Sequence, residues 1–173
     1  MIKTLEEIDT VRQRGFRPGV VACFLHDKKI LLLYKKEHNL WQLPQGGIEN
    51  SETIEQAFSR EMSEELGAEF VESTGGEISY VAEDKVEFPL KKQGDRDLQT
   101  DDGQPVKMKG KKYFFICAYR FNPDINIQKT EFDDSRWVNF EEGLRLADKI
   151  YQKGKQRITL KILNKLKELN LIS

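Results

Sequence analysis

The 173-residue sequence predicts an α/β protein with a mixed β-sheet covered on both faces by helices. Short apolar runs that are typical of buried strands lie on both sides of a helical stretch at 53–66, and a second helical stretch follows at 156–169. Hydrophobic residues make up 38% of the chain, which is enough to fill one core. We therefore expect a single domain spanning 1–173, with 1–15 as an N-terminal extension.

The first predicted elements form a β-hairpin. Residues 19–25 and 30–34 are rich in β-branched and other apolar side chains, and the polar segment 26–29 separates them. Residues 41–49 follow with a proline and two glycines, which favour a loop over regular structure.

Residues 53–66 have apolar side chains at helical spacing, so we expect an amphipathic helix there. Thr53 followed by Gln56 fits a capping box at the start of the helix. Gly67 fits its C-terminal stop.

The second half of the chain predicts further strands and a last helix. The strand-like stretches and the helix lie at 76–82, 84–88, 112–121, 135–140 and 156–169. The polar, turn-rich segment 89–111 is long for a loop in one domain, and such loops are usually functional or mobile.

Composition excludes several classes of protein. The net charge is −1, so there is no overall basic field for duplex DNA or an acidic membrane. No stretch approaches the ~18 apolar residues of a membrane span, and the N-terminus lacks a signal sequence, so we expect a cytoplasmic protein. Cys23 and Cys117 lie in apolar runs without metal-site spacing, which predicts buried free thiols. The sequence makes no prediction of an oligomeric state.

The predicted helix carries acidic side chains on its buried side. At about 100° per residue from Ile54, Glu61 lies at about 340° and Glu65 at about 20°, inside the apolar stripe, with Glu64 beside it at about 280°. Buried carboxylates need protonation, pairing or a metal ion, and Mg²⁺ or Mn²⁺ prefers such oxygen ligands. The alternative is a solvated acidic surface on which Arg60 pairs with Glu64.

Two glycines, Gly46 and Gly47, precede this helix, and together they extend the pattern to GGIENSETIEQAFSREMSEELG. This run resembles the Nudix box. The positions that match its fixed glycines and charged residues are Gly46, Glu52, Arg60, Glu61, Glu64, Glu65 and Gly67. Ala68 stands where a larger aliphatic residue is common.

The resemblance implies a Nudix α/β/α sandwich and a metal-dependent hydrolase. By the same resemblance, the glutamates of the Arg-Glu-x-x-Glu-Glu segment bind Mg²⁺ or Mn²⁺, joined by the backbone carbonyl of Gly46. Arg60 is expected to orient these carboxylates through a salt bridge to Glu52 or to a ligand. Glu131 is a candidate further ligand or general base, with a surface acid as its alternative. The catalytic candidates are Glu64, Glu61, Arg60 and Glu131, and the metal-binding candidates are Gly46, Glu61, Glu64, Glu65 and Glu131.

Segments outside the box are similar to bacterial RNA 5′-pyrophosphohydrolases and to asymmetric dinucleoside-polyphosphate hydrolases. These segments are FRP at 16–18, WQLPQGGI at 41–48, KKYFFICAY at 111–119 and EFDDSRWV at 131–138. The resemblance predicts removal of pyrophosphate from the 5′ end of RNA. The alternatives are hydrolysis of diadenosine tetraphosphate and a catalytically silent module that binds nucleotides.

The candidate substrate-binding residues are basic, aromatic or amide side chains and one backbone position. They are Arg17, Lys35, Lys36, Trp41, Gln42, Gln45 and Gly47. Solvated surface charge remains the alternative for the three cations, and packing remains the alternative for the tryptophan. Related RNA enzymes carry an aromatic-lysine pair near the last helix, where this chain offers Tyr151, Lys153 or Lys155.

Overall fold

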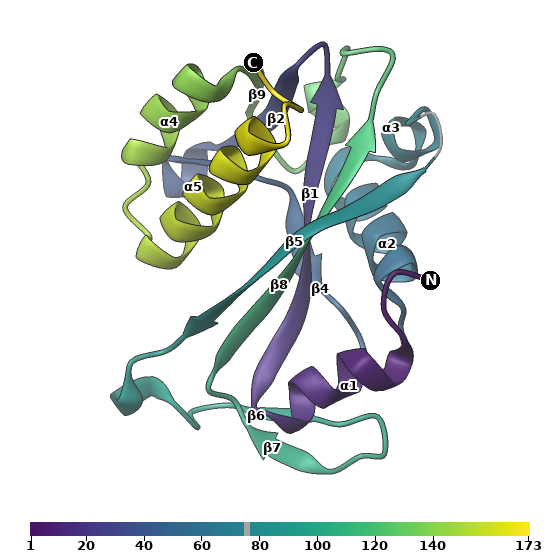
Figure 1. The fold of residues 1–173 in the computed structure, drawn as a ribbon, viewed down its shortest axis with the longest axis vertical. Helices are drawn as coiled ribbons and strands as arrows, with labels where there is room; N and C mark the ends of the chain where they lie inside the picture. The colour runs from purple at the N-terminus through teal and green to yellow at the C-terminus, as the bar shows by residue number, and fades with distance from the viewer. Residues whose placement is uncertain (75–76) are drawn as a thin grey trace.

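The computed structural model describes residues 1–74 and 77–173, and it has a mixed β-sheet between two helical layers (Figure 1). The main sheet contains seven strands, ordered β3-β2-β1-β8-β5, with β4 paired to β1 and β9 paired to β2. Its strands are β1 (Phe16–His26), β2 (Lys29–Lys35), β3 (Leu40–Gln42), β4 (Gln45–Gly47), β5 (Ile78–Glu87), β8 (Gly110–Tyr119) and β9 (Asp134–Val138). The helices are α1 (Leu5–Gln13), α2 (Ile54–Leu66), α3 (Ala68–Glu72), α4 (Phe140–Asp148) and α5 (Lys153–Glu168). The predicted α/β class with a mixed sheet is confirmed.

Strand β1 is the centre of the sheet, and its two edges differ. One edge pairs in parallel with β8 along ten residues. The other edge pairs with β2 only at Leu25 and His26, and with β4 at Gly19, Val20 and Val21. This division of one edge between two partners places β4, which carries the Gly-Gly sequence, against the middle of the sheet.

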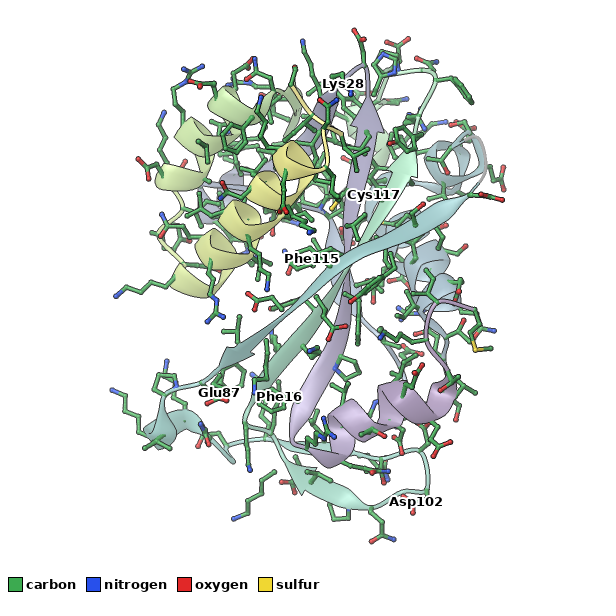
Figure 2. The ribbon with its side chains drawn as sticks, viewed as in Figure 1. Phe16, Lys28, Glu87, Asp102, Phe115 and Cys117 are labelled. Atoms are coloured by element: carbon green, nitrogen blue, oxygen red, sulfur yellow. The ribbon has the colours of Figure 1, made fainter. Side chains whose placement is uncertain are left out.

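Alternating side chains of β1 fill two separate cores. Val21 and Cys23 point to the core beneath α4 and α5, whereas Val20 and Phe24 point to the core beneath α2. Figure 2 labels Phe115 and Cys117 near the middle of β8, which contributes both residues to the first core. The two cysteines are free and buried, as expected.

The helix at 53–66 is confirmed together with its caps. Thr53 accepts a hydrogen bond from the backbone of Gln56, the Gln56 side chain accepts one from the backbone of Thr53, and the helix ends before Gly67 at φ 92°. The last predicted helix is also present, and it begins at Lys153, earlier than expected. Three of the four N-terminal positions of α5 are Lys, Gly and Lys, which carry no apolar spacing to reveal the first turn.

Several local expectations were wrong. The segment 41–49, expected as a loop, includes the end of β3 and all of β4. The stretches 76–82 and 84–88 belong to one strand, β5, with an irregularity between Tyr80 and Ala82, and residue 76 lies outside the described residues. The strand expected at 135–140 ends at Val138, where Asn139 caps the unpredicted helix α4 by accepting a hydrogen bond from the backbone N–H of Glu142.

The segment 89–111 has structure of its own. It contains a 3₁₀ turn (Leu90–Lys92) and a two-stranded sheet of β6 (Asp97–Gln99) and β7 (Pro105–Lys107). This small sheet lies beside α1 at the end of the molecule away from α4, where Figure 2 labels Asp102.

Helix α1, in the predicted extension, holds the loop that precedes α2. Its Arg12 is 3% exposed and donates hydrogen bonds to the carbonyls of Ile48 and Glu49 at 3.0 and 2.8 Å. Arg12 also pairs with Asp101 at 3.1 Å, and Asp101 accepts hydrogen bonds from residues 50–51. The loop before α2 is therefore held by hydrogen bonds from Arg12 and to Asp101. Among the helices that the structure describes, none is long and apolar enough to cross a membrane.

Candidate active site

Arg60 on α2 connects the loop to the acidic face of the helix. Its guanidinium donates two hydrogen bonds to Glu52 at 2.8 Å, one to Glu61 at 2.7 Å and one to the carbonyl of Gly47 at 2.9 Å. Burial opposes ionisation of Glu52, but the hydrogen bonds from Arg60 and from the backbone of Glu49 hold its pKa below the usual value. Hydrogen bonding to Glu52 raises the pKa of Arg60, so both groups are charged.

Gly46 lies directly against the carboxylate of Glu61. A Cβ atom at position 46 would meet the Glu61 Cδ at 2.0 Å and its Oε2 at 2.1 Å, and no side chain fits at those distances. Glycine is therefore required here for close approach, since its backbone conformation is not left-handed. The absence of a side chain brings the backbone of β4 and the Glu61 carboxylate together.

Glu65 lies one turn further along α2 and is largely buried. Its carboxylate accepts a hydrogen bond from the backbone N–H of Gln45 at 3.2 Å. Burial, with the nearby charges of Glu131 and Glu61, raises the pKa of Glu65 to about 8 despite that hydrogen bond. The backbone N–H of Glu131 donates to the carbonyl of Glu65 at 3.1 Å, so the segment that carries Glu131 is hydrogen-bonded to the C-terminal end of α2.

The donor chemistry of this cluster fits a hard divalent cation. Two carboxylates with little access to water repel each other, and a cation between them would remove that cost. Within residues 1–74 and 77–173, no three acidic, histidine or cysteine side chains form a ready coordination shell. Glu61 is turned to Arg60, and Glu64 is 59% exposed with its carboxylate 3.9 Å from the same guanidinium. Residues that hold a metal ion here would be Glu61, Glu64 and Glu65.

The acidic face of α2 forms one wall of a cavity of about 400 Å³. Cations from three other elements line the same cavity, namely Arg17 on β1, Lys111 on β8 and Lys155 on α5. The remaining lining residues are Pro18, Gly19, Gln42, Gln45, Gly46, Gly47, Glu61, Glu65 and Tyr113. A cavity with carboxylates on one wall and cations on the other fits an anion bridged to a metal ion.

The cations are held by packing and by hydrogen bonds. Lys155 donates to the side-chain oxygen of Gln42 at 2.9 Å, and a Cβ at Gly47 would lie 2.6 Å from the guanidinium of Arg17. Burial, followed by repulsion from neighbouring cations, lowers the pKa of Lys155 and of Lys111. These effects disfavour the charged form of both lysines, and an anion in the cavity would favour it.

The other sequence candidates lie outside this cavity. Lys35 lies over the ring of Phe132 at 5.8 Å, and the backbone N–H of Lys36 donates to Asp133 at 2.7 Å. Trp41 lies beside Tyr34, with ring centroids 5.2 Å apart and ring planes tilted by 39°. Of the three candidates near the last helix, Lys155 alone lines the cavity, because the hydroxyl of Tyr151 bonds to the carbonyl of His38 and Lys153 is exposed.

Sequence reasoning missed Lys111 and Tyr113. Side chains alternate along a strand, so both share a sheet face with the buried Phe115. The signal in the sequence is that a lysine and a tyrosine occupy positions on the face of β8 that is otherwise apolar. Their use in the site depends on the parallel register Arg17↔Lys111, which only the fold supplies.

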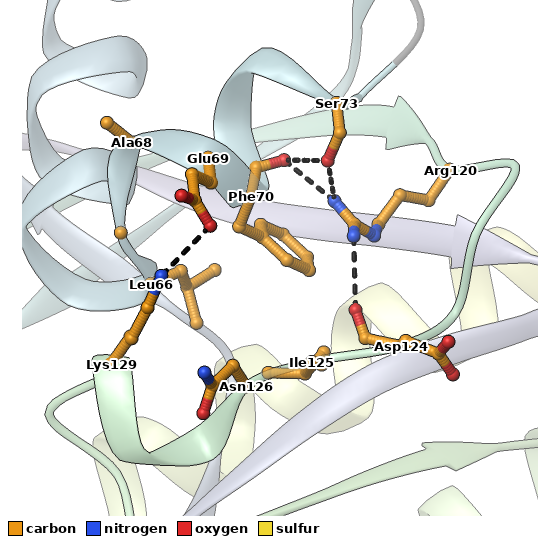
Figure 3. Close-up of a pocket in the computed structure, with 11 residues that line it drawn as sticks. Leu66, Ala68, Glu69, Phe70, Ser73, Arg120, Asp124, Ile125, Asn126 and Lys129 are labelled. Atoms are coloured by element: carbon orange, nitrogen blue, oxygen red, sulfur yellow. Dashed lines mark hydrogen bonds and ion pairs between the residues drawn. The ribbon is translucent and has the colours of Figure 1, made fainter.

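A larger cavity of about 660 Å³ lies between α3 and the segment 120–129, and Figure 3 shows its lining. Arg120 is 6% exposed there and lies over the ring of Phe70 at 3.7 Å. Its guanidinium donates to three backbone carbonyls and to Ser73, and Lys129 pairs with Glu69 at 3.1 Å. These cations are already used in holding the fold, so the cavity has a structural explanation.

Comparison with known proteins identifies the family of this chain. Residues 15–159 match the NUDIX domain family, so the chain belongs to the Nudix family. Nudix hydrolases generally use divalent metal ions and act on nucleotide or RNA substrates.

Among individual relatives, the chain is similar to bacterial RNA pyrophosphohydrolases. It is 36% identical over 132 residues to the Histophilus somni (strain 2336) protein, a match that covers 73% of this chain and 65% of that relative. It is 32% identical over 171 residues to the Pasteurella multocida (strain Pm70) protein, which covers 92% and 81% of the two chains.

Solved structures share the fold. The E. coli dihydroneopterin triphosphate pyrophosphohydrolase aligns with a TM-score of 0.56 at 15% identity, over 86% of this chain and 97% of the other. The NUDIX domain of Shewanella oneidensis NrtR, solved with ADP ribose, aligns with a TM-score of 0.56 at 18% identity, over 89% and 88%. The fold is the Nudix α/β/α sandwich, as the resemblance implied.

Proposed function

We propose that this protein is a divalent-metal-dependent hydrolase of phosphoanhydride bonds that removes pyrophosphate from the 5′ end of RNA. The observation that carries the proposal is the cavity in which two α2 carboxylates face cations from β1, β8 and α5. Hydrolysis of a polyphosphate requires positive charge near its oxygens, which the basic wall of this cavity supplies and to which a metal ion held by the carboxylates would add. The names of the relatives support an RNA end as the substrate, and a cytoplasmic location stays a prediction from the sequence.

In this proposal Glu61, Glu64 and Glu65 hold Mg²⁺ or Mn²⁺ with the carbonyl of Gly46. The bound ion supplies positive charge to the phosphate oxygens and to a water molecule. Arg60 keeps the Glu61 carboxylate beside Gly46 and shares its charge with Glu52.

Glu131 is proposed as a further ligand or as the general base. Its backbone is fixed to the carbonyl of Glu65, so its side chain starts next to the buried carboxylate. Its own position on an exposed segment leaves it free to reach a water molecule from solvent.

The substrate phosphates are assigned to the basic wall. Arg17 and Lys155 supply charge, and Gln42, Gln45 and the backbone of Gly47 supply polar groups within the same cavity. Lys35, Lys36 and Trp41 lie outside it, and we assign them to the part of the substrate that extends beyond the reacting phosphates.

The test compares 5′-triphosphorylated RNA with diadenosine tetraphosphate, each with Mg²⁺, with Mn²⁺ and with chelator. Released phosphate, pyrophosphate and nucleotides are measured. Metal-dependent conversion of the RNA to a 5′-monophosphate, faster than cleavage of the dinucleotide, supports the proposal. Faster cleavage of the dinucleotide to ATP and AMP assigns the same cavity to dinucleoside polyphosphates, because the reacting bond is chemically the same.

Turnover of neither substrate would contradict the hydrolase assignment and favour a catalytically silent module that binds nucleotides. The retained set of Glu61, Glu64 and Glu65 argues against such a module, since a silent site has no need of three acids on one helix face. Binding of a nucleotide without turnover, measured by calorimetry, would identify it.

A further inference from the structure

A second cavity, of about 370 Å³, adjoins the candidate active site. Arg17 and Lys111 line both cavities, so the two spaces meet at these side chains. The far wall comes from the segment between β5 and β6, which contributes Lys92 and Arg96. The remaining lining residues are Phe88, Pro89, Asp95 and Met108.

The four cations of this second cavity are not neutralised by ion pairs. In the part of the chain that the structure describes, none of them lies within 4.0 Å of a carboxylate. The contrast with Lys112 is direct, because this next residue of β8 pairs with Glu83 at 2.8 Å. Asp95 is the one acid in the lining, against four cations.

The segment that carries Lys92 and Arg96 is anchored by backbone hydrogen bonds. Gly94 donates to the carbonyl of Met108 at 2.9 Å, and Met108 donates to the carbonyl of Arg96 at 2.9 Å. The turn at Lys92 is closed by its bond to Pro89 at 2.8 Å. The cations are therefore held at fixed backbone positions around the cavity.

Repulsion among these cations is felt most at Lys111, which is partly buried, because Arg17, Lys92 and Arg96 are exposed to solvent. Lys111 is half-buried, and burial, with the charges of Arg17 and Arg96, lowers its pKa. An anion between the cations would turn this repulsion into attraction. The cavity therefore suits a negative ligand, and its continuity with the active site indicates that the ligand belongs to the same substrate.

We propose that this second cavity binds a phosphodiester group of the RNA chain downstream of the 5′ end that reacts in the first cavity. The proposal rests on the proposed function for the identity of the substrate. Lys92 and Arg96 supply charge to the phosphodiester, while Arg17 and Lys111 lie between it and the reacting phosphates. A second anion site next to the first favours an RNA end, which carries a phosphodiester beyond its reacting phosphates, over a mononucleotide, which carries none.

The variant that tests the proposal is Lys92→Ala/Arg96→Ala, and Lys91→Ala is the matched control. Lys91 belongs to the same turn as Lys92 but does not line the cavity. The kcat/KM values are measured for ATP and for 5′-triphosphorylated RNA of two and four nucleotides, at 50 and 200 mM salt.

We expect kcat/KM of the wild type and of Lys91→Ala to rise with RNA length, and the rise to be largely lost in the double variant. Each phosphate contact with a single strand contributes about 0.7 to the slope of log K against log salt, so two contacts contribute about 1.4. The loss in the double variant should then be about sevenfold larger at 50 mM salt than at 200 mM. An unchanged length dependence and salt slope would overturn the proposal.

A binding measurement separates this proposal from the proposed function. Fluorescence anisotropy reports the affinity for a 5′-monophosphorylated tetranucleotide, which needs no turnover. Weaker binding to the double variant than to Lys91→Ala supports the cavity even if the wild type fails to hydrolyse RNA. Equal affinities of the double variant and Lys91→Ala for the tetranucleotide overturn it. If the double variant loses as much affinity for diadenosine tetraphosphate as for the tetranucleotide, the proposal is also overturned, and the cavity is assigned to a polyphosphate chain.

Discussion

Gly46→Ala is the sharpest test of the active-site geometry, because it adds one methyl group where the structure has no room. The new Cβ would lie 2.0 Å from the Cδ of Glu61, whereas ordinary contact begins at 3.4 Å. The Glu61 carboxylate must therefore move by about 1.4 Å, and a displacement of about 1 Å at a reacting centre costs about 100-fold in rate. We expect kcat to fall by about that factor.

The free energy of unfolding should change little in this variant. Replacement of a glycine stabilises the chain by about 0.5–1 kcal/mol through loss of unfolded-state entropy. Loss of the partly exposed Arg60–Glu61 ion pair costs about 1 kcal/mol at most. The two effects nearly cancel, so the loss of activity should occur in a normally folded protein.

The assay is initial-rate hydrolysis of 5′-triphosphorylated RNA at saturating Mg²⁺, with urea unfolding of the same preparation. Gly154→Ala is the matched control, because a Cβ at that position in α5 meets Val86 at an ordinary 3.7 Å. A Gly46→Ala enzyme with kcat within about threefold of the wild type would refute the argument that glycine positions Glu61.

Three further outcomes follow from the same structure. Glu64→Gln should change the unfolding free energy by less than about 0.5 kcal/mol, since Glu64 is 59% exposed, while Mg²⁺-dependent turnover falls about 100-fold; unchanged turnover would remove Glu64 from the metal site. Arg12→Met should cost about 3 kcal/mol in urea unfolding, because it leaves the carbonyls of Ile48 and Glu49 without their donor and removes the ion pair with Asp101; a cost below about 1 kcal/mol would contradict the role of Arg12 in holding this loop. MgCl₂ at 100 times its Kd should stabilise the wild type by about 2.7 kcal/mol, which is measured as a higher Tm, and should leave the Tm of Glu61→Gln/Glu64→Gln unchanged; an equal rise in the Tm of both proteins would place the ion elsewhere.

The parts of the fold that depend on local sequence were predictable. Helix α2 was placed with both caps, because Thr53, Gln56 and Gly67 act within a few residues of their own backbone. Helix α4 was missed although Asn139 is a good capping residue, because the apolar alternation of the preceding strand continues to Phe140.

The parts that depend on distant contacts were not predictable. Strand β4 has the sequence Gln-Gly-Gly, which has no intrinsic preference for a strand and becomes one by pairing with β1. The acidic wall of the cavity was visible on a helical wheel, whereas Lys111 became part of the site through the register between β1 and β8. Local periodicity thus identified the carboxylates, and tertiary pairing selected the cations.

The hydrogen bonds from Arg12 to the loop before α2 bear on where this protein can be truncated or fused to another protein. The family match begins at residue 15, two positions after the end of α1, so the residue that grips the active-site loop lies outside the stretch by which the family is detected. Leu163 and Leu166 of α5, both fully buried, also lie beyond its other limit at residue 159. A protein trimmed to the detected stretch would keep every residue of the Nudix box and lose part of what holds it in shape. The ends of an engineered version should therefore be chosen from the packing of α1 and α5, and not from the limits of the family match. A transplant of this box into another protein should include α1.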